Sequence, residues 1–173
     1  MEPAMSTILF AAMPTNDARH LWSGGPDAYG MKPEVSRSTG AGTPCRHCLR
    51  NIDEGEAYLI LAYRPFPALQ PYAETGPIFL HAEPCPRYEA IEILPPVLET
   101  SPDFILRGYC ADDRIVYGTG AVTETARITD RADELLSRND IAYLHVRSAR
   151  NNCFQCRIDR QKAPHHLDVG AFI

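Results

Sequence analysis

Two short groups of cysteine and histidine residues have the types and the spacing that a bound metal ion requires. Cys45 and Cys48 are separated by two residues, and His81 and Cys85 follow after 32 intervening residues. Structural zinc sites use four tetrahedral nitrogen and sulfur ligands, and two separated ligand pairs let one ion join two distant loops. The four residues therefore predict a structural zinc site, with zinc as the cofactor.

Two alternatives to this ligand set stay open on the sequence alone. In the first there is no metal, and the residues are a free cysteine pair, a helix cap and a buried thiol, because cysteine is often buried. In the second, Cys153 and Cys156 form another C-x2-C step, which joins the first one in an all-cysteine site of Cys45, Cys48, Cys153 and Cys156. Residues three apart in a strand face opposite sides, so Cys153 and Cys156 need a bulge to share one ion. We therefore expect Cys156 in the core.

The last two predicted strands carry a second candidate site. They cover residues 141–147 and 153–159, and the short loop between them is typical of a hairpin. Side chains alternate along a strand, which places Leu144 and Phe154 on an apolar face. The opposite face then carries a mixed polar set: Tyr143, His145, Arg147, Cys153, Gln155 and Arg157.

This polar face is a candidate ligand-binding surface. We expect Arg147 to pair with Cys153, and in that register His145 lies beside Gln155. Guanidinium groups with neighbouring hydrogen-bond donors suit a small anion. An enzyme with His145 as base and Cys153 as nucleophile is a further interpretation, although no third residue that would orient the base is identifiable. The alternative without a ligand is an outer sheet face in contact with solvent.

The elements that position these residues are predicted from local patterns. Apolar or alternating runs predict strands, in addition to the final hairpin, over residues 6–13, 57–63, 77–81, 103–110 and 114–122. Cap residues and prolines predict helices over residues 15–22, 84–93 and 130–138. Residues 23–44 are rich in glycine and proline and are expected to carry little regular structure.

Strands outnumber helices among these predicted elements. This favours an α+β fold with a mainly antiparallel sheet and a few short helices. The first ligand pair, the hairpin after it and a helix beginning at Cys85 indicate a treble-clef-like zinc loop region. A length of 173 residues fits one domain over residues 1–173. We expect a core over residues 24–160, an N-terminal segment over 1–23 and a tail over 161–173.

Composition narrows the class of protein. Apolar residues make up 45% and charged residues 23% of the chain, as in globular proteins. A net charge of −5 argues against nucleic acid as a partner, because phosphate contacts need clustered basic residues. The apolar runs are shorter than the ~20 residues of a membrane helix, and no basic segment precedes the first one. We expect a cytoplasmic protein with no membrane partner.

Five strings in the chain, taken together, resemble one bacterial family. They are PCRHCL at 44–49, LAYRPF at 61–66, PYAETGPIFLH at 71–81, AYLHVR at 142–147 and CFQCRIDR at 153–160. The chain is similar to the family catalogued as domain of unknown function 1203 over about residues 24–160. The resemblance implies no established activity. It also implies that zinc is not a family-wide feature, because many members differ at His81 and Cys85, and that a small residue is usual at Cys156.

The leading hypothesis is an intracellular domain whose zinc ion fastens the N-terminal loops to an α+β core. Whether it is an enzyme is left open, since no phosphate-binding glycine loop, nucleophile elbow or HExxH segment is present. The second hypothesis is an enzyme or small-anion binder that uses the polar face of the last hairpin. The third is a protein-interaction module, or a homodimer, that uses the proline-rich loop over residues 64–72.

Overall fold

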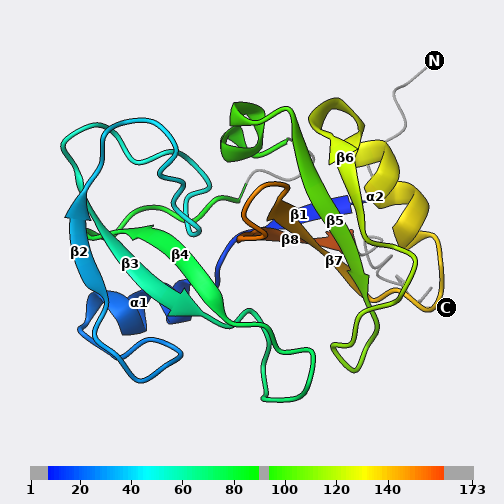
Figure 1. The fold of residues 1–173 in the computed structure, drawn as a ribbon, viewed down its shortest axis with the longest axis horizontal. Coiled ribbons are helices and arrows are strands. Elements are labelled where there is room, and N and C mark those ends of the chain that lie inside the picture. The colour runs from blue at the N-terminus through cyan, green and yellow to red at the C-terminus, as the bar shows by residue number, and fades with distance from the viewer. Residues whose placement is uncertain (1–7, 90–93, 162–173) are drawn as a thin grey trace, which may run out of the picture.

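The computed structural model describes residues 8–89 and 94–161, and its strands form two antiparallel sheets (Figure 1). The larger sheet has the order β1-β8-β7-β5-β6 and the smaller sheet the order β2-β3-β4. In the larger sheet the strands are β1 (Ile8–Ala11), β5 (Asp103–Tyr109), β6 (Ala121–Glu124), β7 (Tyr143–Ser148) and β8 (Phe154–Arg160). In the smaller sheet they are β2 (Glu34–Arg37), β3 (Ala57–Tyr63) and β4 (Gly76–His81).

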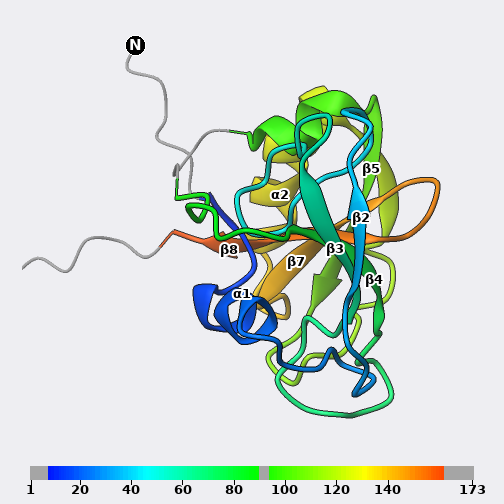
Figure 2. The same cartoon turned by 90° about the vertical axis from the view of Figure 1, so that its left-hand side faces the viewer.

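Two short α-helices accompany the sheets. The first, α1 (Thr15–Trp22), follows β1 and lies below β8 in the side view (Figure 2). The second, α2 (Ile128–Leu136), packs against the larger sheet (Figure 1). Short 3₁₀ helices, η1 (Pro96–Thr100) and η2 (Thr125–Arg127), precede β5 and α2. The predicted α+β class with a mainly antiparallel arrangement is confirmed. Within the described ranges, no helix has the length and apolar character needed to cross a bilayer.

The apolar side chains form separate cores on the two sheets. One core lies between the larger sheet and α2 and contains Leu106, Leu135, Leu144 and Cys156. The other gathers residues in and next to α1, the C-x2-C loop and the smaller sheet: Met13, Ala18, Leu21, Cys45, Cys48, Ile52, Leu59, Leu61, Ile78 and Leu80. Burial of one such leucine contributes roughly 1.5–3 kcal/mol. Each sheet therefore has its own source of apolar stabilisation.

The region after β5 differs from the predicted strand over residues 114–122. Regular pairing begins only at Ala121, and Ile115 makes a single isolated bridge to Tyr109. Asp113 and Gly118 have φ values of 60° and 86°, in the left-handed region. Two such residues in this segment turn the chain twice, and a regular strand does not accommodate that conformation.

The predicted helix over residues 84–93 is also wrong over its first part. Residues 84–89 have no helical structure, and residues 90–93 lie outside the described residues. Cys85 is followed by Pro86, whose ring disfavours the helical conformation of the preceding residue. The ligand-bearing helix start expected of a treble clef is therefore replaced at Cys85 by a segment without regular structure.

The edge strand β2 was not predicted. Its four residues, Glu34–Arg37, lie in the glycine-rich and proline-rich segment and pair with β3. Three of the four are exposed, so the strand carries no apolar alternation from which it can be recognised. The helix predicted over residues 130–138 forms two residues earlier, over Ile128–Leu136.

Candidate functional site

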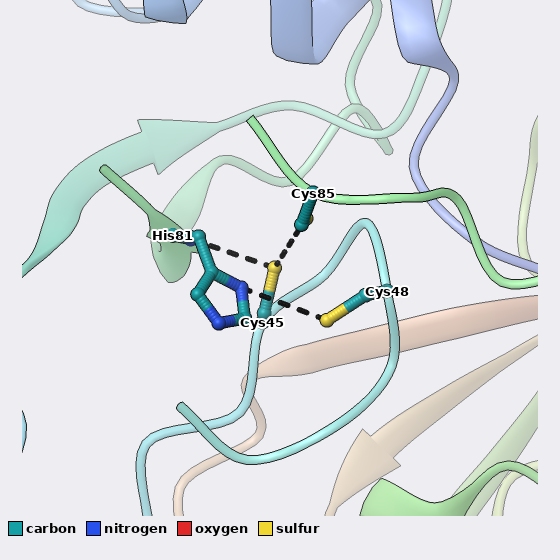
Figure 3. A group of neighbouring side chains, drawn as sticks. All are labelled: Cys45, Cys48, His81 and Cys85. Atoms are coloured by element: carbon teal, nitrogen blue, oxygen red, sulfur yellow. Dashed lines mark hydrogen bonds between the residues drawn. The ribbon is translucent and has the colours of Figure 1, made fainter. Parts of the chain in front are cut away.

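Cys45, Cys48, His81 and Cys85 come together at one end of the smaller sheet (Figure 3). We call them the Cys/His cluster. Cys45 and Cys48 lie on a tight loop that is closed by a hydrogen bond from the Cys45 N–H to the Arg50 carbonyl, 2.9 Å. His81 is the last residue of β4, and Cys85 follows on the irregular segment after it. The four ligand atoms all lie within 4.8 Å of one another, so the cluster can hold a metal ion.

The two sequence-distant pairs interleave in the cluster. The Cys45 Sγ lies 3.8 Å from the Cys85 Sγ, and the Cys48 Sγ lies 3.6 Å from the His81 Nδ1. The backbone N–H of His81 donates to the Cys45 Sγ at 3.5 Å. Cys45 therefore contacts both residues of the second pair, and Cys48 contacts His81, as Figure 3 shows. An N–H donor to a sulfur also favours the thiolate form that binds metal.

Hydrogen bonds among the three thiols separate their pKa values. Bonds with the Cys48 and Cys85 thiols lower the pKa of Cys45, whereas the bond with Cys45 raises the pKa of Cys48 to about 11. The pKa of Cys85 is raised too, first by its bond with Cys45. Without a cation the cluster therefore favours one thiolate shared among three sulfurs. Ionisation of all three requires a bound metal ion.

Side chains around the cluster orient two of its members, and sequence reasoning missed them. The His81 Nε2 lies 3.5 Å from the Glu56 carboxylate, which leaves Nδ1 for the cluster. The His47 Nδ1 lies 3.4 Å from the Cys85 Sγ, and its Nε2 lies 3.0 Å from the Thr15 hydroxyl. Such outer contacts orient metal ligands. The only sequence signal was the position of His47 inside the C-x2-C step.

The rival all-cysteine site does not form in the described part of the chain. The metal-ligand cluster found there includes neither Cys153 nor Cys156. Cys156 is completely buried in the core of the larger sheet, where burial raises the pKa of its thiol to about 12. Its expected place in the core is confirmed.

The final hairpin has a different register from the expected one. His145 pairs with Arg157, not Gln155, and Arg147 pairs with Phe154, not Cys153. The pairing shifts between Val146 and Arg147, at a bulge or irregularity of the ladder. A bulge inserts an unpaired residue and reverses the side-chain alternation beyond it. For this reason Phe154 lies on the face of His145, with ring centroids 4.8 Å apart, and not on the expected apolar face.

The polar face of this hairpin is buried, not exposed to solvent. The exposed fractions of Tyr143, His145 and Arg147 are 3%, 0% and 4%. Phe66 from the proline-rich loop covers them, with its ring 5.1 Å from that of His145. Glu74, after the same loop, accepts from Arg147 at 3.1 Å. The interpretation as a solvated outer face is therefore wrong.

The other residues of the candidate ligand surface have local partners. Arg157 lies over the Tyr143 ring at 3.8 Å and donates to Asp159 at 2.8 Å. The Cys153 thiol lies 3.7 Å from the Asn151 carbonyl, and Gln155 donates to the Cys153 carbonyl at 3.2 Å. The structure brings together Tyr143, His145, Arg147 and Arg157 and leaves Cys153 at the end of the hairpin.

The proline-rich loop over residues 64–72 has both buried and exposed apolar residues. Phe66 is buried beneath the loop, whereas Leu69 is 79% exposed. Arg64 donates to the Phe66 carbonyl at 3.3 Å. The loop is thus part of the protein interior on one side.

The fold and the cluster define the class: an α+β protein of two antiparallel sheets with a Cys3His set able to hold a metal ion. A family model described as a protein of unknown function, DUF1203, matches residues 42–160, more than half of the chain. The chain belongs to this family, as the resemblance indicated, and the matched range contains both the cluster and the final hairpin. No curated protein and no solved structure shows significant similarity to the chain.

Proposed function

We propose that this chain is a zinc-binding protein in which the Cys/His cluster holds one structural zinc ion. The distances within the cluster carry the proposal. Zinc–sulfur bonds of about 2.3 Å at tetrahedral angles place two sulfurs about 3.8 Å apart, and a sulfur and a nitrogen about 3.5 Å apart. The observed separations are 3.8 Å for Cys45 and Cys85 and 3.6 Å for Cys48 and His81.

The donor set supports zinc in a structural role. Three thiolates and one imidazole are soft and borderline ligands, which suit zinc better than calcium or magnesium. Four protein ligands complete a tetrahedral shell and leave no open position for water or substrate, in contrast to catalytic zinc sites. The residues present therefore fit a zinc ion that contributes to folding.

A zinc ion at this place would join three segments of the chain. Cys45 and Cys48 belong to the C-x2-C loop, His81 ends β4, and Cys85 begins the segment that returns to the start of α1. On that segment Arg87 donates to the Ala12 carbonyl at 2.7 Å. The ion would thus fasten the N-terminal elements and the smaller sheet at one point.

We expect about one zinc per chain in protein that is purified without added metal and measured by elemental analysis. Cys45→Ser should lower the zinc content, because it removes one of the four ligands and its thiolate charge. Cys110→Ser is the matched control, since Cys110 is a half-buried cysteine outside the cluster, and should keep its zinc. A folded wild-type protein without zinc, or a zinc content unchanged in Cys45→Ser, would contradict the assignment.

We also propose a cytoplasmic location. The six cysteines are all free, and a reducing compartment keeps metal-binding thiols from forming disulfides. Fractionation of cells that express the untagged chain should place it with soluble cytoplasmic proteins, and its recovery in a periplasmic or membrane fraction would reject this location.

A further inference from the structure

A large cavity lies between the two sheets, and its lining includes no residue of the Cys/His cluster. Its volume is about 760 Å³, which is within the range of small-molecule sites. One wall comes from α1, β3 and the start of the proline-rich loop, and the other from β7 and β8. Apolar side chains, among them Leu61, Phe66 and Phe154, line much of it. The cavity thus suits the apolar body of a small molecule.

One residue of the cavity wall carries a buried donor without a partner. His145 lines it and is completely buried, and its Nε2 has no hydrogen-bond partner among the described residues. The Arg147 guanidinium lies 3.4 Å from the His145 Nδ1. Because arginine only donates, Nδ1 accepts and Nε2 carries the hydrogen. A buried N–H without a partner is costly, so an acceptor from a ligand would offset that cost.

Two arginines on the cavity wall have no carboxylate partner among the described residues. Arg64 contacts only the Phe66 carbonyl through its Nε, so its terminal nitrogens are free of an ion pair there. Arg87 donates to the backbone carbonyls of Ala12 and Met13. The third arginine, Arg157, is already paired with Asp159, as described above. Arg64 is therefore the best-placed cation to meet an anionic group.

The balance of charge limits what the cavity can accept. Its wall carries three arginines and three aspartates: Arg64, Arg87, Arg157, Asp17, Asp27 and Asp159. The Asp27 carboxylate is satisfied by three backbone N–H groups, at 2.9–3.0 Å. Asp17 accepts from the Tyr63 hydroxyl at 3.0 Å. With no excess of positive charge, the cavity favours a singly charged ligand over a phosphate-rich one.

We propose that this cavity binds a small organic monocarboxylate with an apolar body. The His145 Nε2–H and the Arg64 guanidinium bind the carboxylate, because a planar guanidinium fork and an N–H donor match its two oxygens. The aromatic and aliphatic wall takes the rest of the molecule. The site differs from the hairpin surface expected from the sequence, because Arg64 belongs to the proline-rich loop and the Arg147 guanidinium points to the other nitrogen of His145.

The test is a titration of the wild-type protein with benzoate, phenylacetate, indole-3-acetate and octanoate. Binding is measured by calorimetry and by the ¹⁵N signal of the His145 imidazole. We expect saturable binding of at least one of them, with a shift of the Nε2 signal. The matching neutral amide should bind at least about 10-fold more weakly, since it lacks the charge. Binding by none of the four, or equal binding of acid and amide, would overturn the proposal.

Two variants and a control assign the residues. Arg64→Gln and His145→Phe should each lower the affinity for the carboxylate that binds the wild type by about 10-fold or more. This corresponds to the loss of one charge-assisted hydrogen bond. Arg127→Gln removes an exposed arginine outside the cavity and should bind as wild type does. Wild-type affinity in Arg64→Gln would overturn the assigned contact even if His145→Phe fails to fold.

Tighter binding of phenyl phosphate than of benzoate would overturn the monocarboxylate class. Zinc content measured on the same samples keeps this test separate from that of the metal site.

Discussion

His145 shows how strongly a single side chain depends on its surroundings. Its ring lies within 5.3 Å of the Phe66, Tyr109, Tyr143 and Phe154 rings, measured between centroids. Burial in this aromatic group, and then the neighbouring guanidiniums of Arg147, Arg157 and Arg107, lower its pKa well below the usual value. His145 is therefore neutral in the folded protein at neutral pH, and its Nδ1 is free to accept from Arg147.

This pKa shift predicts a dependence of stability on pH. The folded-state pKa of His145 lies below the unfolded value of about 6.5, so the unfolded chain binds more protons at acidic pH. The stability that the neutral ring provides is complete above about pH 6.5 and is lost as the pH falls below it, by at most ~1.4 kcal/mol per pH unit. Urea unfolding at several pH values should show this loss in the wild type and a smaller loss in His145→Phe. Parallel pH profiles of the two proteins would contradict it.

The C-x2-C loop is held in place by an element far away in the sequence. Arg46, between the two cysteines, is 3% exposed and donates from Nε to the Phe154 carbonyl of β8 and from Nη1 to the Pro44 carbonyl. Burial lowers its pKa to about 10, so it remains charged at neutral pH. The cation thus connects the metal-ligand loop with the larger sheet.

Replacement of this arginine should destabilise the connection. Arg46→Met retains an apolar stem but removes the donor to the Phe154 and Pro44 carbonyls, and we expect a loss of roughly 2–4 kcal/mol of unfolding free energy. Arg50→Met, on the same loop but exposed, is the matched control and should change stability by less than about 0.5 kcal/mol. Denaturant unfolding of the three proteins provides the measurement, and similar midpoints for both variants would refute the role of Arg46.

The whole molecule combines two sheets whose cores are distinct. The Cys/His cluster belongs to the core of the smaller sheet, whereas α2 completes the core of the larger one. Hydrogen bonds such as that from Arg46 to β8, and the Glu74 carboxylate shared by Arg107 and Arg147, join them. We therefore expect the two sheets to depend on the cluster to different degrees.

Removal of the metal should loosen one part of the molecule first. With a strong chelator present, amide hydrogen exchange should become faster in β3, β4 and the C-x2-C loop, because their core includes Cys45 and Cys48. Exchange in β5, β7 and α2 should change much less. Added zinc should restore the slow exchange, and equal acceleration across both sheets would contradict two separately stabilised cores.

Local patterns determined a substantial part of this protein. The spacing of cysteine and histidine identified the four residues that meet in the cluster, because ligand chemistry restricts which residue types can serve. The apolar run at β3 predicted its bounds, Ala57–Tyr63, because a central strand with a buried face and a half-buried face carries few polar residues. The α+β class followed from the order of such elements, and the family from several matching strings.

Only the tertiary structure decided what happens on the last hairpin. The sequence indicated the alternation of polar residues but neither the bulge that reverses it nor the loop that covers it with Phe66. Burial of His145, the ion pair of Arg147 and the cavity between the sheets depend on segments that lie more than 70 residues apart in the chain. Periodicity within one strand reports which side chains share a face. What lies against that face depends on long-range packing, which no local pattern encodes.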